Sequence, residues 1–391
     1  MMATLEPVTY ETLQWIPRLD EGYRRSSRRA GPYSAAVVPD IADLDIAVPA
    51  DVRADMEHAG HEVARFDAEL GGEIAPFAAV LLRSESAASL RIENLTASAR
   101  SIAEAELPGG RGKANAESIV ANTAALMAAV ALSDSLDAEA ILSMHAALMR
   151  NEPRHTPGRW RTEQVWIGGG NSPMSATFVP PDHSRVPAAI DDLLAFIRRD
   201  DPPVLAHIAV AHAHFETIHP FTDGNGRTGR ALVQAMLRHR DLTRRVTVPV
   251  SAGLLADTDA YFAALTAFRH GDLVPIVQRF TDASIRAVGN GRQLVTELRD
   301  IRERWGESIT ARKDAAVWRV ADLLVRRPVV NGVVLRDELG ISTDHPRRHV
   351  GPLLDAGIVV EFTDRSRNRA WRAPEVLDAL DAFAERAGRR G

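Results

Sequence analysis

Apolar residues recur every three or four positions over most of this chain, and this spacing limits its fold more than any other feature. Between residues 50 and 101 the series includes Val52, Met56, Val63 and Phe66, with polar residues between them. Such spacing places the apolar side chains on one face of a helix. The pattern returns from Ile119 onward, so the chain is predicted to be mainly α.

Two short segments break the helical pattern. Gln164-Val-Trp-Ile167 and Ala176-Thr-Phe-Val179 are β-type runs on either side of Gly168-Gly-Gly-Asn-Ser-Pro173, which predicts a hairpin with a loose tip. Residues 1–50 are expected to be irregular, because prolines interrupt any long periodic segment. These prolines are Pro17, Pro32, Pro39 and Pro49.

Bulk composition excludes several classes of protein. With 391 residues, two or three domains are expected. The net charge of −5 does not by itself indicate nucleic acid or a membrane as partner. The absence of cysteine excludes disulfides, thiolate nucleophiles and cysteine-ligated zinc. The N-terminus lacks the features of a secretory signal, and no apolar run reaches membrane-spanning length, so we expect a cytoplasmic protein.

Three helices are predicted on the two sides of one glycine-rich loop. Helices are expected over Val186–Arg198 and from Val204 to about Ile218, and a glycine-rich loop at 219–226 then opens a helix from Arg227 to His239. The loop and the helix start read His219-Pro-Phe-Thr-Asp-Gly-Asn-Gly-Arg-Thr-Gly-Arg230.

The residue types in this loop suit the handling of phosphate groups. Gly224 and Gly226 let the backbone approach a ligand closely, and the helix that follows presents unpaired N–H groups to an anion. Asp223 offers a hard oxygen to Mg²⁺. Arg227 and Arg230 lie on one face of the helix and can hold phosphate oxygens.

At the start of the loop, His219 could take a proton from an attacking hydroxyl. Each residue alone would fit a solvated loop with a capping aspartate. The full set in twelve residues indicates phosphoryl or nucleotidyl transfer.

The loop resembles the signature of the Fic family, His-x-Phe-x-Asp/Glu-Gly-Asn-Gly-Arg-x-x-Arg, at every defined position. The resemblance implies a Fic-type helical core that transfers AMP from ATP to a Ser, Thr or Tyr hydroxyl of a protein, possible targets including the chain itself. It implies roles for eight residues: His219 as base, Phe221 as loop anchor, Asp223 for Mg²⁺, Asn225 with the N–H groups of Gly224 and Gly226 for the α-phosphate, Arg227 for the β-phosphate and Arg230 for the γ-phosphate.

Two further segments fit the resemblance. The hairpin at 164–179 corresponds to the family's flap, which holds the target as an added strand; the alternative is an ordinary surface hairpin. Tyr261 falls where relatives often place an aromatic residue near adenine, although a tyrosine at helical spacing is more often part of the core. Asp272-Leu-Val-Pro-Ile276 departs from relatives that have tryptophan there.

Ser89-Leu-Arg-Ile-Glu93-Asn94 resembles the family's inhibitory-helix pattern, Ser/Thr-x-x-x-Glu-Gly/Asn. The resemblance implies that Glu93 pairs with Arg230 and takes the place of the γ-phosphate. The alternative is a surface glutamate paired with a nearby arginine.

Residues 311–391 differ in character from the rest, with 15 basic and 12 acidic residues. Helices over Asp314–Arg326, Val333–Leu339 and Thr343–Ala356, followed by a hairpin around Thr363–Asn368, predict a winged-helix domain. Arginines at 347 and 348, and at 365, 367 and 369, could meet DNA, but a protein-interaction module is equally compatible, and Pro346 interrupts the third helix.

The predicted domains are an N-terminal helical region with the inhibitory helix (1–110), a Fic core (111–290), a linker helix (291–310), a winged-helix-like domain (311–375) and a helical tail (376–391). A second hypothesis is a winged-helix DNA-binding regulator with the Fic core as nucleotide sensor. Another nucleotide donor, removal of AMP, and a homodimer stay open.

Two other sites are rejected on spacing. Pro108–Ala114 lacks the first glycine and the final Ser/Thr of a phosphate-binding P-loop. His207, His212 and His214 do not have the spacing of a helical zinc site, so His212 and His214 are expected to be polar helix positions.

Overall fold

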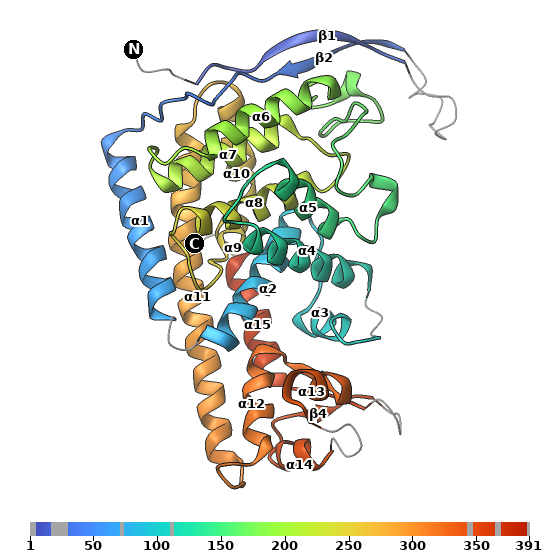
Figure 1. Ribbon diagram of the computed structural model, residues 1–391, viewed down its shortest axis with the longest axis vertical. Coiled ribbons are helices and arrows are strands. Elements are labelled where there is room, and N and C mark those ends of the chain that lie inside the picture. The colour runs from blue at the N-terminus through green and yellow to red at the C-terminus, as the bar shows by residue number, and fades with distance from the viewer. Residues whose placement is uncertain are drawn as a thin grey trace. The chain divides into compact units, whose positions relative to one another are not determined.

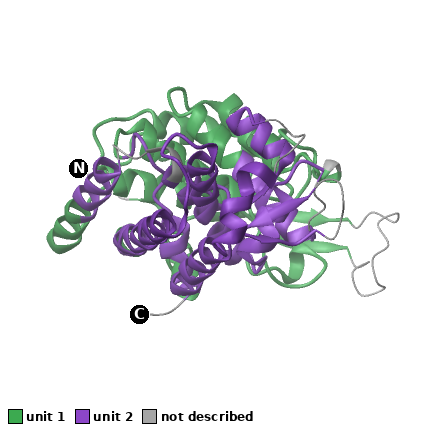
Figure 2. Cartoon of the chain, turned by 90° about the horizontal axis from the view of Figure 1, so that it is seen from below, with its two compact units in different colours: residues 1–58, 125–242, 259–281 green, residues 59–124, 243–258, 282–391 purple. Residues whose placement is uncertain are grey.

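The computed structural model describes residues 5–16, 30–70, 74–109, 113–341, 347–363 and 369–388. Helices dominate these residues, which confirms the mainly α class. Contacts group the chain into two compact units (Figure 2): unit 1 contains residues 1–58, 125–242 and 259–281, and unit 2 contains residues 59–124, 243–258 and 282–391. The domain boundaries drawn from the sequence stay predictions.

Unit 1 holds the glycine-rich loop and the predicted flap. Its strands and helices are β1 (Thr9–Trp15), β2 (Gly31–Val37), α5 (Ala138–Leu148), η2 (Pro153–His155), η3 (Pro173–Ser175), η4 (His183–Arg185), α6 (Val186–Ile197), α7 (Val204–Ile218), α8 (Asn225–His239) and α10 (Thr258–Arg269, whose first residue belongs to unit 2). Three helices, α1 (Ala50–Glu69), α4 (Ala114–Ala131) and α11 (Val274–Ser308), contribute residues to both units.

Helix α7 forms the centre of unit 1. Every residue from Leu205 to Ile218 is buried, and α6 and α8 pack against the helix (Figure 1). The alanines among these residues allow neighbouring helices to approach closely. A helix buried on all sides holds the loop that follows it to the core.

The histidines of α7 therefore do not form a polar face, and the prediction for His212 and His214 was wrong. His207 hydrogen-bonds through Nε2 to the carbonyl of Phe196 (2.9 Å), and His212 contacts the hydroxyl of Tyr261 through Nε2 (2.7 Å). Neither ring nitrogen of His214 has a hydrogen-bond partner among the described residues. Periodicity missed this burial because all faces of α7 are covered.

The expectation that residues 1–50 are irregular was also wrong. β1 and β2 form an antiparallel pair with Thr9 opposite Val37 and Trp15 opposite Gly31. Pro32 lies at the second position of β2, and a proline is tolerated near a strand end because its missing N–H removes little from the ladder. Pro17 lies outside the described residues.

The predicted hairpin at 164–179, here called the flap, is present as one bridged pair. The Ile167 N–H donates to the Phe178 carbonyl (2.8 Å), and the Phe178 N–H donates to the Ile167 carbonyl (3.1 Å). Gly169 has φ of 77°, and a Cβ there would lie 2.0 Å from the carbonyl oxygen of Ser175. The glycine-rich tip therefore forms a compact turn instead of extending the two strands.

Unit 2 is built around α2 (Ile74–Ile92), which packs against α9 (Val250–Leu255), α12 (Ala316–Arg326) and α15 (Pro374–Ala387). Its other helix outside the C-terminal segment is α3 (Ala99–Ala105). The buried carboxylate of Glu85 on α2 accepts hydrogen bonds from the N–H (2.9 Å) and the hydroxyl (2.5 Å) of Ser251. These bonds join α2 to the start of α9.

The C-terminal segment contains the three predicted helices and one strand that was not predicted. After α12 come β3 (Val329–Asn331), α13 (Gly332–Leu339), α14 (Arg347–Asp355), β4 (Val360–Glu361) and β5 (Ala370–Arg372). The strands form an antiparallel sheet in the order β3-β5-β4. Pro346 and most of the predicted hairpin tip, including the arginines at 365 and 367, lie outside the described residues.

Within the part of the chain that the structure describes, no helix combines the length and the apolar character needed to cross a bilayer.

Burial of His214 predicts acid sensitivity. Burial lowers the pKa of His214 from 6.5 to about 3, so at pH 5 the unfolded chain binds a proton there that the folded chain does not. Stability is therefore lost as pH falls below 6.5, by about 2 kcal/mol between pH 7 and pH 5 for this group. We expect His214→Leu to reduce the pH dependence of the unfolding free energy by that amount in urea titrations.

If the unfolding free energies of wild type and His214→Leu depend equally on pH, the buried His214 is not a source of acid sensitivity.

Candidate functional site

Two residues with left-handed backbone conformations set the path of the loop between α7 and α8. His219 ends α7 with φ of 52°, and its N–H donates to the Phe215 carbonyl (2.9 Å). Gly224 precedes α8 with φ of 75°, and a Cβ there would lie 3.0 Å from Leu148. The positive φ and the close neighbour explain why glycine is needed at 224.

Phe221 is completely buried beneath the loop. Its ring stacks on the imidazole of His145, with centroids 3.7 Å apart and planes 6° from parallel, and it also contacts Trp160. Burial of this ring holds the middle of the loop against α5.

His145 braces the loop and was not found from the sequence. Its Nδ1 accepts a hydrogen bond from the Gly158 N–H (3.0 Å), and its Nε2 donates to the Asp223 carbonyl (3.1 Å). Burial lowers its pKa to about 4, so the ring is neutral at pH 7, as this pattern requires. A lone histidine on an apolar helix carries no spacing signal that would have revealed this role.

Asn225 holds the loop from its other end. Its Oδ1 accepts a hydrogen bond from the Phe221 N–H (2.8 Å), and its Nδ2 donates to the Phe221 carbonyl (2.9 Å). The side chain is 2% exposed. The sequence predicts an α-phosphate contact for Asn225, whereas its observed contacts position the loop backbone.

Arg161 is a second bracing residue that the sequence did not reveal. Its side chain is 2% exposed, and its guanidinium donates to carbonyls on both sides of the loop and the flap. The acceptors are the carbonyls of His219 (2.9 Å), Glu163 (3.0 Å), Pro181 (2.5 Å) and Ile218 (3.5 Å). Burial lowers its pKa to about 10, so it stays charged at pH 7. A single buried cation thus ties the end of α7 to the base of the flap.

The imidazole of His219 is held in its neutral form. Burial lowers its pKa to about 3, the charge of Arg161 acts in the same direction, and the carbonyl of Glu216 opposes them. At pH 7 a ring nitrogen is therefore available to accept a proton.

Asp223 is the exposed acidic group of the loop. One carboxylate oxygen accepts from the Gly224 N–H (2.7 Å) and lies 3.3 Å from Arg227 Nη2, and the other lies 3.9 Å from His155 Nε2. Its side chain is 47% exposed. A hard, solvent-facing carboxylate suits Mg²⁺, which is commonly bound through one or two carboxylates together with substrate phosphates.

The start of α8 is electropositive. Its N-cap residue is Gly224, which has no side chain to cap the helix, and Gly226, Arg227 and Arg230 lie in its first two turns. Both arginines are largely buried. A helix N-terminus that begins at a glycine and carries two arginines favours an anion.

Tyr261 lies in the core. It is 1% exposed and its hydroxyl contacts His212, whereas the next residue, Phe262, is 50% exposed. This geometry favours the core interpretation of Tyr261 over a contact with adenine.

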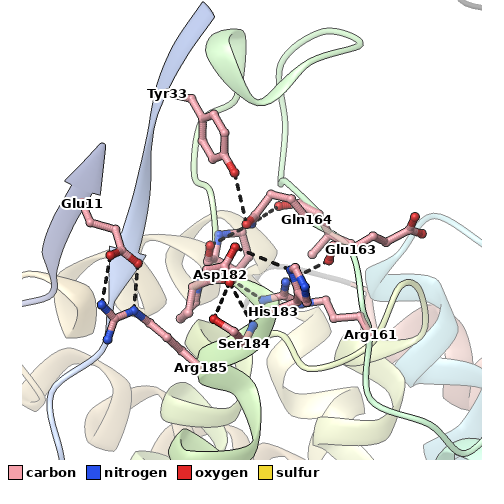
Figure 3. Close-up of polar contacts among 12 residues, drawn as sticks. Glu11, Tyr33, Arg161, Glu163, Gln164, Asp182, His183, Ser184 and Arg185 are labelled. Atoms are coloured by element: carbon pink, nitrogen blue, oxygen red, sulfur yellow. Dashed lines mark hydrogen bonds and ion pairs between the residues drawn. The ribbon is translucent and has the colours of Figure 1, made fainter. Parts of the chain in front are cut away.

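The β1–β2 hairpin is joined to the flap. The Ala36 N–H donates to the Val179 carbonyl (2.9 Å), and Tyr33 donates its hydroxyl to Gln164 Oε1 (3.5 Å; Figure 3). Glu11 forms a two-bonded ion pair with Arg185, at 2.8 and 2.9 Å. The N-terminal residues thus support the flap. No sequence motif predicted this role.

Glu93 lies in unit 2, just beyond the last residue of α2. Asn94 has φ of 62°, its N–H donates to the Arg91 carbonyl, and the Leu95 N–H donates to the Leu90 carbonyl (3.1 Å). These bonds form a Schellman cap, whose left-handed position favours glycine or asparagine. The Gly/Asn preference after Glu93 therefore has a backbone cause.

The loop lies within the part of the chain that matches a known family. Residues 135–237 match the sequence model of the Fic/DOC family. The protein adenylyltransferase fic-1 of Caenorhabditis elegans is 31% identical over 160 residues, which are 39% of this chain and 28% of that protein. The protein adenylyltransferase Fic of Nematostella vectensis is 30% identical over 161 residues, 40% of this chain and 34% of that protein. The matches thus span about a third or less of these relatives.

The fold is also similar to a solved structure. A Fic family protein from Desulfovibrio desulfuricans G20 superposes with a TM-score of 0.54 at 23% identity, and the match covers 84% of this chain and 97% of that one.

The contacts of Arg161 predict a loss of stability on conservative replacement. Lysine retains the charge but cannot reach several carbonyls at once, so buried acceptors lose their partners. We expect Arg161→Lys to lower the unfolding free energy by about 3 kcal/mol in urea titrations. Arg159→Lys, at an exposed position two residues away, should change it by less than about 0.5 kcal/mol. Similar values for the two variants would show that the carbonyl contacts of Arg161 contribute little.

Proposed function

We propose that this chain, whose residues 135–237 form a Fic/DOC family domain, is a protein adenylyltransferase that moves AMP from ATP to a Ser, Thr or Tyr hydroxyl. The observation that carries the proposal is the braced loop, which joins a neutral histidine to a helix N-terminus that begins at a glycine and bears two arginines. A base and an anion-binding helix start are the two parts that nucleotidyl transfer requires.

In this reaction the target hydroxyl oxygen attacks the α-phosphorus of ATP. The bond from the α-phosphorus to the pyrophosphate breaks, and the hydroxyl proton passes to His219. The neutral ring of His219 supports this role, because a protonated imidazole could not accept a proton.

The phosphates would be bound at the start of α8. The N–H groups of Asn225 and Gly226 suit the α-phosphate, since the Gly224 N–H donates to Asp223, and Arg227 suits the β-phosphate and Arg230 the γ-phosphate. Asn225 would act mainly by holding the loop through Phe221. Asp223 would hold Mg²⁺, which supplies neutralisation of phosphate charge when bound.

The target segment is expected to add as a strand along the flap. Residues 176–179 are bonded to Ile167 on one side and to Ala36 of β2 on the other. The outer edge of Gln164–Ile167 is therefore the side we expect a target to use.

We expect His219→Ala to lower the rate of AMP transfer by about 10²- to 10⁴-fold and to leave ATP affinity nearly unchanged, since other groups bind the phosphates. The measurement is label retained on protein from α-labelled ATP with Mg²⁺, beside ATP titration by calorimetry. His183→Ala, at an exposed histidine, should transfer AMP at the wild-type rate.

Because the pKa of His219 is about 3, the wild-type rate should not fall between pH 8 and pH 6 through protonation of this base. Wild-type rates in His219→Ala would remove it as the base. If only another nucleotide labels the protein, that nucleotide is the donor. If a labelled target loses AMP, the chain removes AMP.

We also propose that Glu93 inhibits the transferase by pairing with Arg230. The support is the sequence pattern from Ser89 to Asn94, together with the Schellman cap that holds the residues around Glu93 in one conformation. Paired with Glu93, Arg230 would not be available to the γ-phosphate.

A double-mutant cycle tests this inhibition. Glu93→Gly should raise the initial labelling rate, and combining it with Arg230→Ala should return the rate toward the low level, so the effects should not add. Initial rates of the wild type, the two single variants and the double variant decide the question. Equal rates for wild type and Glu93→Gly would refute inhibition by Glu93 and leave the transferase proposal intact.

For the C-terminal segment we propose a winged-helix-like domain, on the basis of α12–α14 and the β3-β5-β4 sheet. Several of its arginines are ion-paired: Arg326 and Arg327 with Glu338, and Arg369 with Glu361. Only Arg369 belongs to the arginines expected to meet DNA, so a protein-interaction module and DNA binding both stay open. Salt-dependent binding of duplex DNA to the full chain would support the regulator hypothesis instead.

A further inference from the structure

A cavity of about 460 Å³ lies within unit 2 between α2, α3 and α15. Seven of its lining residues are alanines, so the helices meet through small side chains that leave space between them: Ala87, Ala88, Ala97, Ala99, Ala103, Ala384 and Ala387. Larger apolar residues, including Ile102, Ile119 and Phe383, also line the cavity. Cavities of this size accept small organic molecules.

Two arginines of α2 line the same cavity. Arg91 donates through Nη1 to the carbonyl of Ala384, and the described residues provide no other hydrogen-bond acceptor for it. Arg83 donates to the carbonyl of Arg326 and lies 3.4 Å from Glu106, and its Nε makes no hydrogen bond within the described ranges. Both guanidiniums therefore keep donors for a ligand.

The two acidic residues that line the cavity are less suited than the arginines to bind a ligand. Asp381 accepts a hydrogen bond from the Ala99 N–H (2.8 Å) near the start of α3, and Glu385 lies on an exposed position of α15. A cationic ligand would approach Arg83 and Arg91, whereas an anionic ligand would find unused donors there.

We propose that this cavity binds a small amphipathic carboxylate, with its hydrocarbon part against the alanine walls and its carboxylate on Arg91 and Arg83. Filling the space would restore dispersion contacts that the alanines cannot make and would remove apolar surface from water. A guanidinium recognises a carboxylate through two parallel hydrogen bonds.

A ligand in this cavity would contact α2 near its C-terminal end. Arg91 precedes Glu93 by two residues, so a ligand held by Arg91 would influence the end of the helix that carries Glu93. That consequence rests on the proposed function. Binding itself does not, and calorimetry detects it whether or not the chain transfers AMP.

The test uses octanoate as probe, with 1-octanol as its neutral analogue and octylamine as its cationic analogue. Calorimetry with the full chain should detect octanoate, with at least about tenfold weaker binding of the two analogues. Octanoate should also raise the melting temperature. Arg91→Gln should weaken octanoate about tenfold or more, whereas Arg100→Gln, on an exposed part of α3, should not.

Ala88→Phe should abolish octanoate binding by filling the cavity, and Ala384→Leu provides a smaller obstruction if the first variant does not fold. No heat with octanoate at millimolar concentration would overturn the site. Binding of 1-octanol as tight as that of octanoate, or unchanged octanoate affinity in Arg91→Gln, would overturn the carboxylate assignment. Unchanged binding in a folded Ala88→Phe would place the ligand elsewhere.

Discussion

The buried guanidinium of Arg161 is the interaction on which the candidate site depends. It binds the carbonyls of Ile218 and His219 at the end of α7 and those of Glu163 and Pro181 at the base of the flap. Removing a charge from water is costly, so this arrangement is stable only because several carbonyl dipoles compensate the guanidinium. The same contacts require the loop and the flap base to keep one relative arrangement.

Burial also determines the chemical state of the site. The pKa of His145 is lowered to about 4 and that of His219 to about 3, so both rings are neutral at pH 7. For His145 the consequence is structural, since one nitrogen must accept and the other must donate. For His219 it bears on reactivity, because a neutral ring can accept a proton. Two histidines thus serve different purposes through the same physical effect.

Helix α2 joins two properties of unit 2. Its C-terminal end is closed by a Schellman cap at Asn94, which holds the backbone around Glu93. Its alanines leave a cavity against α3 and α15, and its arginines line that cavity. The cap and the cavity therefore belong to the same helix, and both depend on how α2 packs within unit 2.

The sequence by itself determined the helical class, the loop from His219 to Arg230 and the positions of α6, α7 and α8. These features depend on periodicity and motifs formed by residues that are close together in the sequence. Tertiary structure decided the features that depend on contacts between distant residues. The roles of His145 and Arg161 depend on contacts between residues up to 78 positions apart, which no local pattern reports. The burial of His212 and His214 and the pairing of β1 with β2 likewise depend on which surfaces neighbouring elements cover, since hydrophobic burial is a property of the assembled core and not of the segment.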